Sequence, residues 1–271
     1  MASTVQEHLE NRELIGLERQ GPSRVRVEPW PRWVRAFVNG SPVADSKRAL
    51  LVMEDRRLPV YYFPPEDVRM DLLVPSGRTE DSSLKGRAEY LTLTVGEITQ
   101  VDAAWRYPGP PEEIAPIAGR VAFHWNAVDA WFEEEDEVFV HPRDPYHRVD
   151  VLQSSRHARV ELDGLTVAET HRPRLLFETG LPTRYYIPKL DVRMDVLTPT
   201  DTRTQCPYKG EAVYWSAEVN GRTHPDIVWS YPSPIPECPK IENHLAFFNE
   251  HADIYVDGEL QERPETPWSK R

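Results

Sequence analysis

The sequence has few cysteines and a deficit of positive charge, and each shortage excludes a class of protein. Only Cys206 and Cys238 occur among 271 residues, so there is no disulfide framework and no CxxC pair of the kind that forms structural zinc sites. The nine histidines include no HExxH motif, and we expect no metal and no other cofactor. With 32 basic against 44 acidic side chains, the formal net charge is −12, which argues against nucleic acid as a partner.

Long apolar segments are missing as well. No apolar run approaches the roughly 18–20 residues that cross a bilayer, and the first residues show no basic-then-apolar signal pattern. We therefore expect a soluble, cytoplasmic protein without membrane contact. Proline, in contrast, is abundant, because 26 prolines are close to twice the usual ~5%. Since proline ends helices and is excluded from central strands, this composition favours many short elements and excludes long helical bundles.

The chain repeats itself at an offset of 124 residues. Segment 61–71 matches segment 185–195 at eight of eleven positions. Without gaps, the same offset pairs Arg48 with Arg172, Lys85-Gly86 with Lys209-Gly210, Trp105 with Trp229, Tyr107 with Tyr231 and Asp129 with Asp253. A unit of this size is a normal single domain. We therefore expect a helical tail at 1–23, a first domain at 24–147 and a second domain at 148–271.

Each repeat reads as a small, mostly antiparallel β domain. Apolar residues alternate with polar ones, and Asn39-Gly40, Asp163-Gly164 and Asn220-Gly221 are typical of tight hairpin turns, which need positive φ angles. The pattern predicts strands at 50–54, 88–95, 175–178 and 212–219. It predicts short helices only at 111–118 and 239–249, and an amphipathic helix at 3–20.

Four segments of the second repeat resemble the DUF427 family, namely 185–195, 202–212, 229–232 and 246–248. The resemblance covers nearly all of both repeats and implies a mainly β fold, the β-tent or Mss4-like fold, in which two small antiparallel sheets are pinned at one end. Relatives of this fold pin the sheets with zinc held by CxxC pairs, so a zinc-free version is implied here. The family is one of unknown function that also carries a nucleotidyltransferase label, but the sequence has no phosphate-binding glycine motif.

The better-preserved candidate site lies in the second repeat, because the first repeat has Ser82 in place of Cys206. Cys206 and Lys209 lie three residues apart around a proline, and an ammonium group near a thiol favours the reactive thiolate. We predict Cys206 as a nucleophile or redox-sensitive group, Lys209 as its cationic partner and Tyr186 as a proton donor or orienting hydroxyl. The alternative is that Cys206 packs as a small apolar residue and Lys209 is a solvated charge.

Arginine and aromatic side chains supply the predicted ligand contacts. If the stretch 191–195 is an extended strand, Asp191, Arg193 and Asp195 share one face. Arg193 there either grips a carboxylate or phosphate or belongs to a structural charge network. Arg156 and Arg172 add positive charge, and Trp229 and Tyr231 are either walls of a pocket or core residues. The first repeat holds the equivalent candidates Tyr62, Arg69, Lys85 and Trp105.

Three functions follow from these patterns. The first is a small-molecule enzyme or ligand-binding protein, with a small anionic or carbonyl compound as the ligand. The second is a non-catalytic tandem β scaffold that binds a protein or metabolite, and the third is the nucleotidyltransferase that the family label suggests. Because two repeats in one chain can reproduce the two-fold dimer of a single-domain relative, we expect a monomeric pseudo-dimer.

Overall fold

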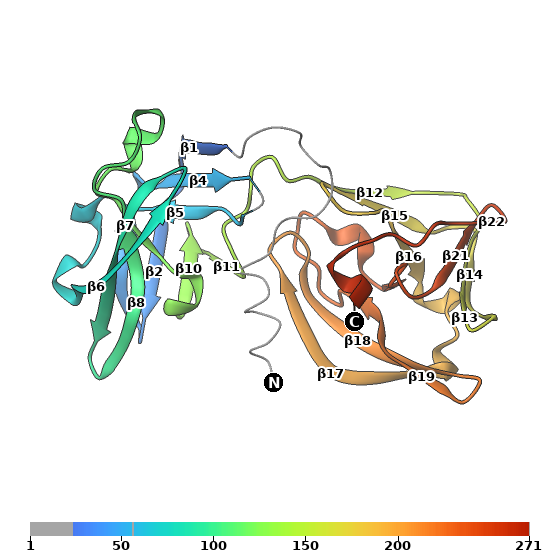
Figure 1. Cartoon of the computed structure of the whole chain (residues 1–271). Coiled ribbons are helices and arrows are strands. Elements are labelled where there is room, and N and C mark those ends of the chain that lie inside the picture. Colours follow the sequence, from blue (N-terminus) through green and yellow to red (C-terminus); the bar gives the residue numbers. More distant parts are fainter. Residues whose placement is uncertain (1–23, 56, 271) are drawn as a thin grey trace. The chain divides into compact units, whose positions relative to one another are not determined.

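The computed structural model describes residues 24–55 and 57–270 (Figure 1). The helix predicted at 3–20 lies outside the described residues. The chain divides into two compact units after Asp144, three residues before the boundary expected from the repeat. Within the described residues, no helix is both long and apolar enough to span a membrane.

The second repeat contains two antiparallel sheets. The larger has seven strands in the order β12 (Val149–Gln153), β15 (Arg174–Glu178), β16 (Arg184–Pro188), β20 (His244–Phe247), β19 (Arg222–Ser230), β18 (Gly210–Val219) and β17 (Leu197–Cys206). The smaller has the order β14 (Leu165–Thr170), β13 (Ala158–Leu162), β21 (Asp253–Val256) and β22 (Glu259–Leu260). The tight turn between β13 and β14 has positive φ at Asp163 and Gly164, as the Asp-Gly pattern predicts.

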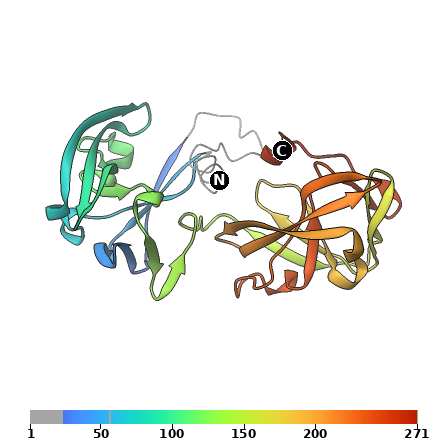
Figure 2. The same ribbon diagram turned by 90° about the horizontal axis from the view of Figure 1, so that it is seen from below.

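The first repeat has the same strand order with one interruption. Its sheets are β1 (Val25–Pro29), β4 (Leu50–Glu54) and β5 (Val60–Tyr62); β6 (Leu73–Ser82), β7 (Gly86–Val95), β8 (Ile98–Arg106) and β9 (Val121–Phe123); and β11 (Asp136–Val138), β10 (Ala130–Glu133), β2 (Val34–Val38) and β3 (Ser41–Ser46). Phe63 and Val121 join the first two sheets through reciprocal backbone hydrogen bonds of 2.8 and 2.9 Å. Small antiparallel sheets in two tandem domains, visible in both views, confirm the predicted mainly β fold (Figure 2).

Within residues 24–55 and 57–270, the helical content is limited to short 3-10 turns. They are η1 (Pro65–Asp67), η2 (Met70–Leu72), η3 (Glu112–Ile117), η4 (Trp125–Ala127), η5 (Lys189–Asp191), η6 (Met194–Val196), η7 (Pro239–Ile241) and η8 (Pro267–Lys270). The helix predicted at 239–249 is therefore wrong beyond Ile241. Asn243 has a φ of 59°, which breaks the helix, and the apolar residues that follow pair with β16 and β19 as strand β20.

Two further expectations need correction. The stretch 191–195 is not an extended strand, because it lies in the consecutive turns η5 and η6; Asp191 and Arg193 therefore do not alternate on one strand face. The gapless offset also fails at Asp129. Ala130 faces Phe37 in β2, whereas Asp253 faces Glu161 in β13, so the offset is 123 from Ala130 onward and the first repeat has one extra residue between His124 and Ala130.

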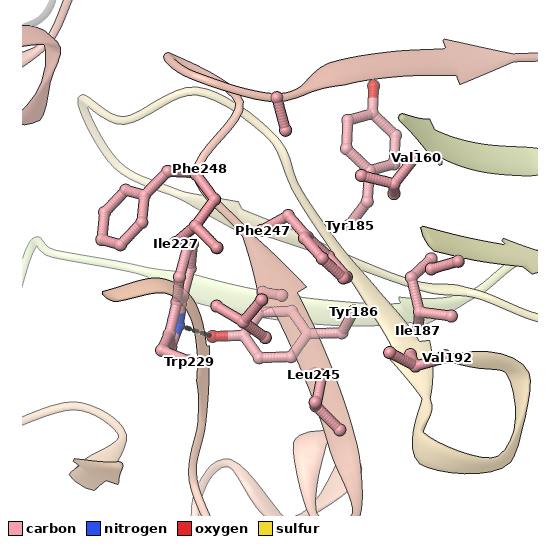
Figure 3. Packing of buried hydrophobic residues seen from close by; sticks show 14 of the residues in the cluster. Val160, Tyr185, Tyr186, Ile187, Val192, Ile227, Trp229, Leu245, Phe247 and Phe248 are labelled. Carbon is pink, nitrogen blue, oxygen red and sulfur yellow. Dashed lines mark hydrogen bonds between the residues drawn. The ribbon is translucent and has the colours of Figure 1, made fainter. Parts of the chain in front are cut away.

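The cores lie on both faces of the larger sheet. In the second repeat one continuous cluster includes Tyr186, Ile187, Leu245 and Phe247 (Figure 3). In the first repeat the clusters on the two faces are separate, and the smaller one packs Leu50, Val52 and Tyr62 beneath Ile114 and Ile117 of η3. Among the candidate site residues, Tyr62 and Trp105 belong to this loop-covered face.

Candidate functional site

The register of the larger sheet places two of the predicted site residues, Tyr186 and Trp229, on one face together with Glu178. Arg174 pairs directly with Tyr186, and Glu178 follows Arg174 by four residues in β15, so all three side chains share that face. Tyr186 pairs with Ala246, which pairs in turn with Trp229. The sheet thereby collects residues from segments that are far apart in the sequence.

The hairpin between β17 and β18 carries the thiol and the lysine. Cys206 pairs with Gly210 across the turn, and the Lys209 N–H donates to the Cys206 carbonyl oxygen at 3.3 Å. Gly210 has a φ of +106°, and a Cβ there would lie 3.2 Å from the Ser233 carbonyl oxygen and 3.4 Å from the Ile235 nitrogen. The glycine thus allows the hairpin to pack tightly against the following loop.

A buried ion pair lies at the centre of the site. The Lys209 Nζ lies 2.5 Å from the Glu178 Oε2, and their side chains are 9% and 7% exposed. The His147 Nε2 lies 3.0 Å from the other carboxylate oxygen. Burial alone would raise the pKa of Glu178, but the Lys209 charge and the bonds from His147 and Lys209 lower this pKa to about 2.

Lys209 is also held in its charged form. Burial opposes its charge, but electrostatic interaction with Cys206 and the negative charge of Glu178 outweigh burial and raise the lysine pKa above its ordinary value. Lysine and glutamate are therefore both ionised at neutral pH. Neither is a proton donor or acceptor there, and together they form a fixed pair of charges beneath the hairpin.

The aromatic residues are buried and hydrogen-bonded within the protein. The Trp229 Nε1–H donates to the Tyr186 hydroxyl oxygen at 3.0 Å (Figure 3), and Tyr186, Trp229 and Tyr231 are all buried. Burial, as the largest cause, raises the pKa of Tyr186 and of Tyr231 well above the ordinary value. These rings pack within the core, and both phenols stay protonated.

The two cysteines differ in exposure. Cys206 is only partly buried and packs against the edge of the core, whereas Cys238 is buried. Burial raises the pKa of the Cys238 thiol to about 11. Cys206 is thus the more exposed of the two thiols, and both thiols interact electrostatically with Lys209.

The first repeat contains the same polar centre without the thiol. Lys85 forms an ion pair with Glu54, both side chains being nearly buried, and the Trp105 Nε1–H donates to the Tyr62 hydroxyl at 3.0 Å. The Ser82 hydroxyl accepts the backbone N–H of Lys85 at 3.2 Å. The Ser82 hydroxyl thus closes the hairpin turn of the first repeat. In the second repeat the Cys206 carbonyl oxygen accepts the equivalent backbone N–H, that of Lys209.

The predicted arginine contacts do not join this centre. Arg193 pairs with Asp195, Arg69 with Asp71 and Arg156 with Asp257, all on exposed surfaces. The Arg193 N–H bonds to Val167 in β14, and Asp257 follows β21, so these pairs belong to the smaller sheet. Arg172 is likewise held by Asp191, at 3.0 Å.

Sequence reasoning missed Glu178 and His147. A signal for the glutamate was present, since Glu54 and Glu178 are identical acidic residues that each end an apolar strand at the 124-residue offset. His147 comes from the segment before β12, and no repeated residue marks it. Across residues 24–55 and 57–270, no group of three or more His, Cys, Asp or Glu side chains is arranged to hold a metal ion.

A second buried ion pair, also missed, lies in the second repeat. The Arg184 Nη1 and Nη2 each donate to a Glu250 oxygen at 2.7 Å, and the side chains are 7% and 0% exposed. The guanidinium carbon lies 5.5 Å from the Trp229 ring centre and 5.9 Å from that of Phe248, distances at which a cation and an aromatic ring attract. Val60 occupies the position of Arg184 in the first repeat, so the duplication offered no signal.

Comparison with family models yields one match in each repeat. Residues 26–134 and 150–258 both match a model described as a domain of unknown function (DUF427), which confirms the resemblance seen in the sequence. The comparison with curated proteins found no match. Both ion pairs between lysine and glutamate lie inside the matched regions, whereas His147 lies outside them.

Proposed function

The chain belongs to the DUF427 family in both of its repeats, and from that premise we propose that the second repeat binds a small carbonyl compound through Cys206. One observation carries this proposal. A partly exposed thiol ends strand β17, one hairpin turn before a buried lysine, and the two side chains interact electrostatically. A positive charge close to a thiol favours the thiolate, which is the nucleophilic form.

The fixed charges define the chemistry that the site supports. Lys209 and Glu178 keep their charges at neutral pH, so the reaction uses the sulfur and solvent. The thiolate sulfur forms a bond to the carbonyl carbon, and the carbonyl π electrons move to the oxygen, which takes a proton from water. The product is a hemithioacetal, and its formation is reversible because the same bond breaks when the oxygen loses that proton.

The first repeat provides an internal control for this function. It has the Lys85–Glu54 ion pair but has Ser82 where the thiol would be. A serine hydroxyl that accepts a backbone N–H closes the turn. We therefore assign the reaction with a carbonyl compound to the second repeat alone.

Selective thiol labelling at pH 6 tests the proposal. Native protein is treated briefly with iodoacetamide, and peptide mapping separates Cys206 from Cys238. An ordinary thiol with a pKa near ~8.5 is almost wholly protonated at this pH and reacts slowly, so fast labelling of Cys206 is the expected result. Lys209→Met should slow it, and Ser82→Cys should create a second fast thiol beside Lys85.

The carbonyl step has its own readout. Addition of a small aldehyde should protect Cys206 from iodoacetamide reversibly, and the hemithioacetal carbon signal seen by NMR with a 13C-carbonyl-labelled aldehyde should be lost in Cys206→Ser. Slow, equal labelling of both cysteines would overturn the thiolate. Fast labelling without aldehyde protection would keep the thiolate and overturn the carbonyl ligand.

A scaffold function is favoured by a different observation. The ion pair and the bond from tryptophan to tyrosine are present in both repeats and are buried, which is the pattern of a structural lock shared by two copies. A tandem scaffold predicts that Cys206→Ala and Lys209→Met leave partner binding unchanged in a folded protein. Pull-down with the wild type and both variants compares the two functions directly.

A further inference from the structure

The Arg184–Glu250 pair holds a segment from much later in the chain. The Thr266 hydroxyl donates to the Glu250 Oε1, and the His251 Nε2 lies 2.8 Å from the Trp268 carbonyl oxygen. The Trp268 ring centre lies 5.5 Å from the Arg184 guanidinium carbon and 6.5 Å from the Phe248 ring centre. Thr266 is thus contacted through its hydroxyl, and Trp268 through its ring and its carbonyl.

The bound segment also satisfies much of its own backbone. The Trp268 N–H donates to the Thr266 hydroxyl oxygen at 3.2 Å, and the Ser269 N–H donates to the Thr266 carbonyl oxygen at 3.0 Å. Pro267 begins the 3-10 turn η8, and its ring fixes φ. A segment that folds on itself in this way loses little further freedom when it binds.

The groups that contact the segment are specific to the second repeat. At the 124-residue offset, Val60, Asn126 and Ala127 stand where Arg184, Glu250 and His251 stand. The aromatic wall behind them is nevertheless kept. Trp105 and His124 have ring centres 4.6 Å apart in the first repeat, against 4.5 Å for Trp229 and Phe248 in the second (Figure 3). The first repeat therefore has the wall without the polar groups.

The chemistry of these groups selects a narrow class of peptide. Glu250 already accepts both arginine donors, and its side chain is fully buried, so a further partner must bring a hydrogen-bond donor that fits beside the guanidinium. A hydroxyl meets this requirement. Two residues later, a flat ring is needed against Arg184, and a backbone carbonyl is needed for His251.

We propose that Arg184, Glu250 and His251, set against Trp229 and Phe248, form a peptide-binding slot for a Thr-Pro-Trp element. Residues 266–268 occupy this slot in cis, and the same element on a separate polypeptide binds in their place. The slot uses neither Cys206 nor Lys209, so the failure of either proposal leaves the other unaffected.

The test must first vacate the slot. A ligand tethered in the same chain acts at an effective concentration on the order of millimolar, so a free peptide at micromolar concentration will not displace residues 266–268. In the full-length Thr266→Ala/Trp268→Ala variant the slot is open. A fluorescein-labelled peptide with the sequence of residues 262–270 is then titrated with this variant and with the wild type, and fluorescence anisotropy is measured.

We expect saturable binding to the vacated variant and at least tenfold weaker binding to the wild type. Adding Glu250→Gln should weaken binding roughly tenfold to hundredfold, the usual effect of losing a hydrogen bond to a charged group. A peptide with alanine in place of its tryptophan should not bind. No saturation up to 1 mM peptide, or equal binding with and without Glu250→Gln, would overturn the slot.

A second, more conservative variant controls for a loss of stability in the Thr266→Ala/Trp268→Ala variant. Thr266→Val removes the hydroxyl and keeps the shape of the side chain, so the ring of Trp268 continues to pack. This variant should bind the labelled peptide more tightly than the wild type does and keep the wild-type circular dichroism spectrum. A folded Thr266→Val variant that resembles the wild type in peptide binding would show that the hydroxyl does not hold the segment, contrary to the proposal.

Discussion

Replacement of Glu178 by glutamine is the perturbation that the buried centre makes most informative. Glutamine keeps the shape of the side chain but leaves the Lys209 ammonium, which is 9% exposed, without a counter-charge. The difference between the ordinary carboxyl pKa of 4.5 and the folded pKa of about 2 corresponds to about 3 kcal/mol at ~1.4 kcal/mol per tenfold change. Breaking a buried pair by removing one partner costs about the same, roughly 3–5 kcal/mol.

The pH dependence carries a definite sign. Because the pKa of Glu178 is lower in the folded chain than in the unfolded chain, the stabilisation is fully present above the unfolded pKa of about 4.5. It is lost as the pH falls from there toward 2, as the carboxylate takes up a proton. Wild type and Glu178→Gln should therefore differ by about 3 kcal/mol at pH 7 and converge near pH 2.

Calorimetry of the full chain measures this effect against a matched control. For a domain of this size, about 3 kcal/mol corresponds to a fall of about 10 °C in the melting temperature of the second repeat. Glu54→Gln should lower the first repeat's transition instead. Glu178→Gln/Lys209→Met should recover much of the loss, since it leaves no buried charge unpaired. A Glu178→Gln variant within 1 kcal/mol of the wild type, with a parallel pH profile, would refute the reasoning.

Three other outcomes follow from the same region. Gly210→Ala should lower the free energy of unfolding of the second repeat in urea by about 2 kcal/mol, because its Cβ would meet the Ser233 carbonyl. Gly221→Ala has open space around it and should lower this free energy by only about 1 kcal/mol. Equal costs for the two variants would contradict the close approach at Gly210. Tyr186→Phe should cost about 1–3 kcal/mol by leaving the Trp229 N–H unpaired, and Tyr62→Phe should do the same in the first repeat, as melting curves can show. Cys238, whose pKa is about 11, should stay unlabelled by iodoacetamide in native protein from pH 6 to 9. If Cys238 in native protein were labelled as fast as it is in urea-unfolded protein, the thiol would not be buried.

The strands were predictable because the repeat and the hairpin dipeptides constrain each other. The prediction at 50–54 coincides with β4, and that at 212–219 lies within β18. Local patterns failed where tertiary pairing decided the conformation. Residues 245–247 have apolar side chains compatible with a helix, but β16 and β19 provide partners on both sides, so the segment becomes part of the central strand β20.

The candidate site was only half visible in the sequence for a related reason. Cys206 and Lys209 are close in the chain, so their proximity could be read directly. Glu178 lies 31 residues from Lys209, and only the pairing of the sheet brings them together. Arg193 illustrates the opposite error, since a strand was assumed where two turns occur, and the arginine turns to its neighbour Asp195 on the surface.

The duplication itself separates structural from ligand-related features. A polar group that both repeats bury in the same geometry, such as each lysine–glutamate pair, is explained by what both domains share, which is their fold. The partly exposed thiol and the Arg184–Glu250 pair are found in one repeat, while the other folds with serine and valine at the same positions. The fold therefore does not require them. Buried charges that a fold can do without are costly to keep, and the retention of the Arg184–Glu250 pair directs the peptide-slot proposal to the second repeat, whereas Cys206, whose counterpart is Ser82, directs the thiol proposal there.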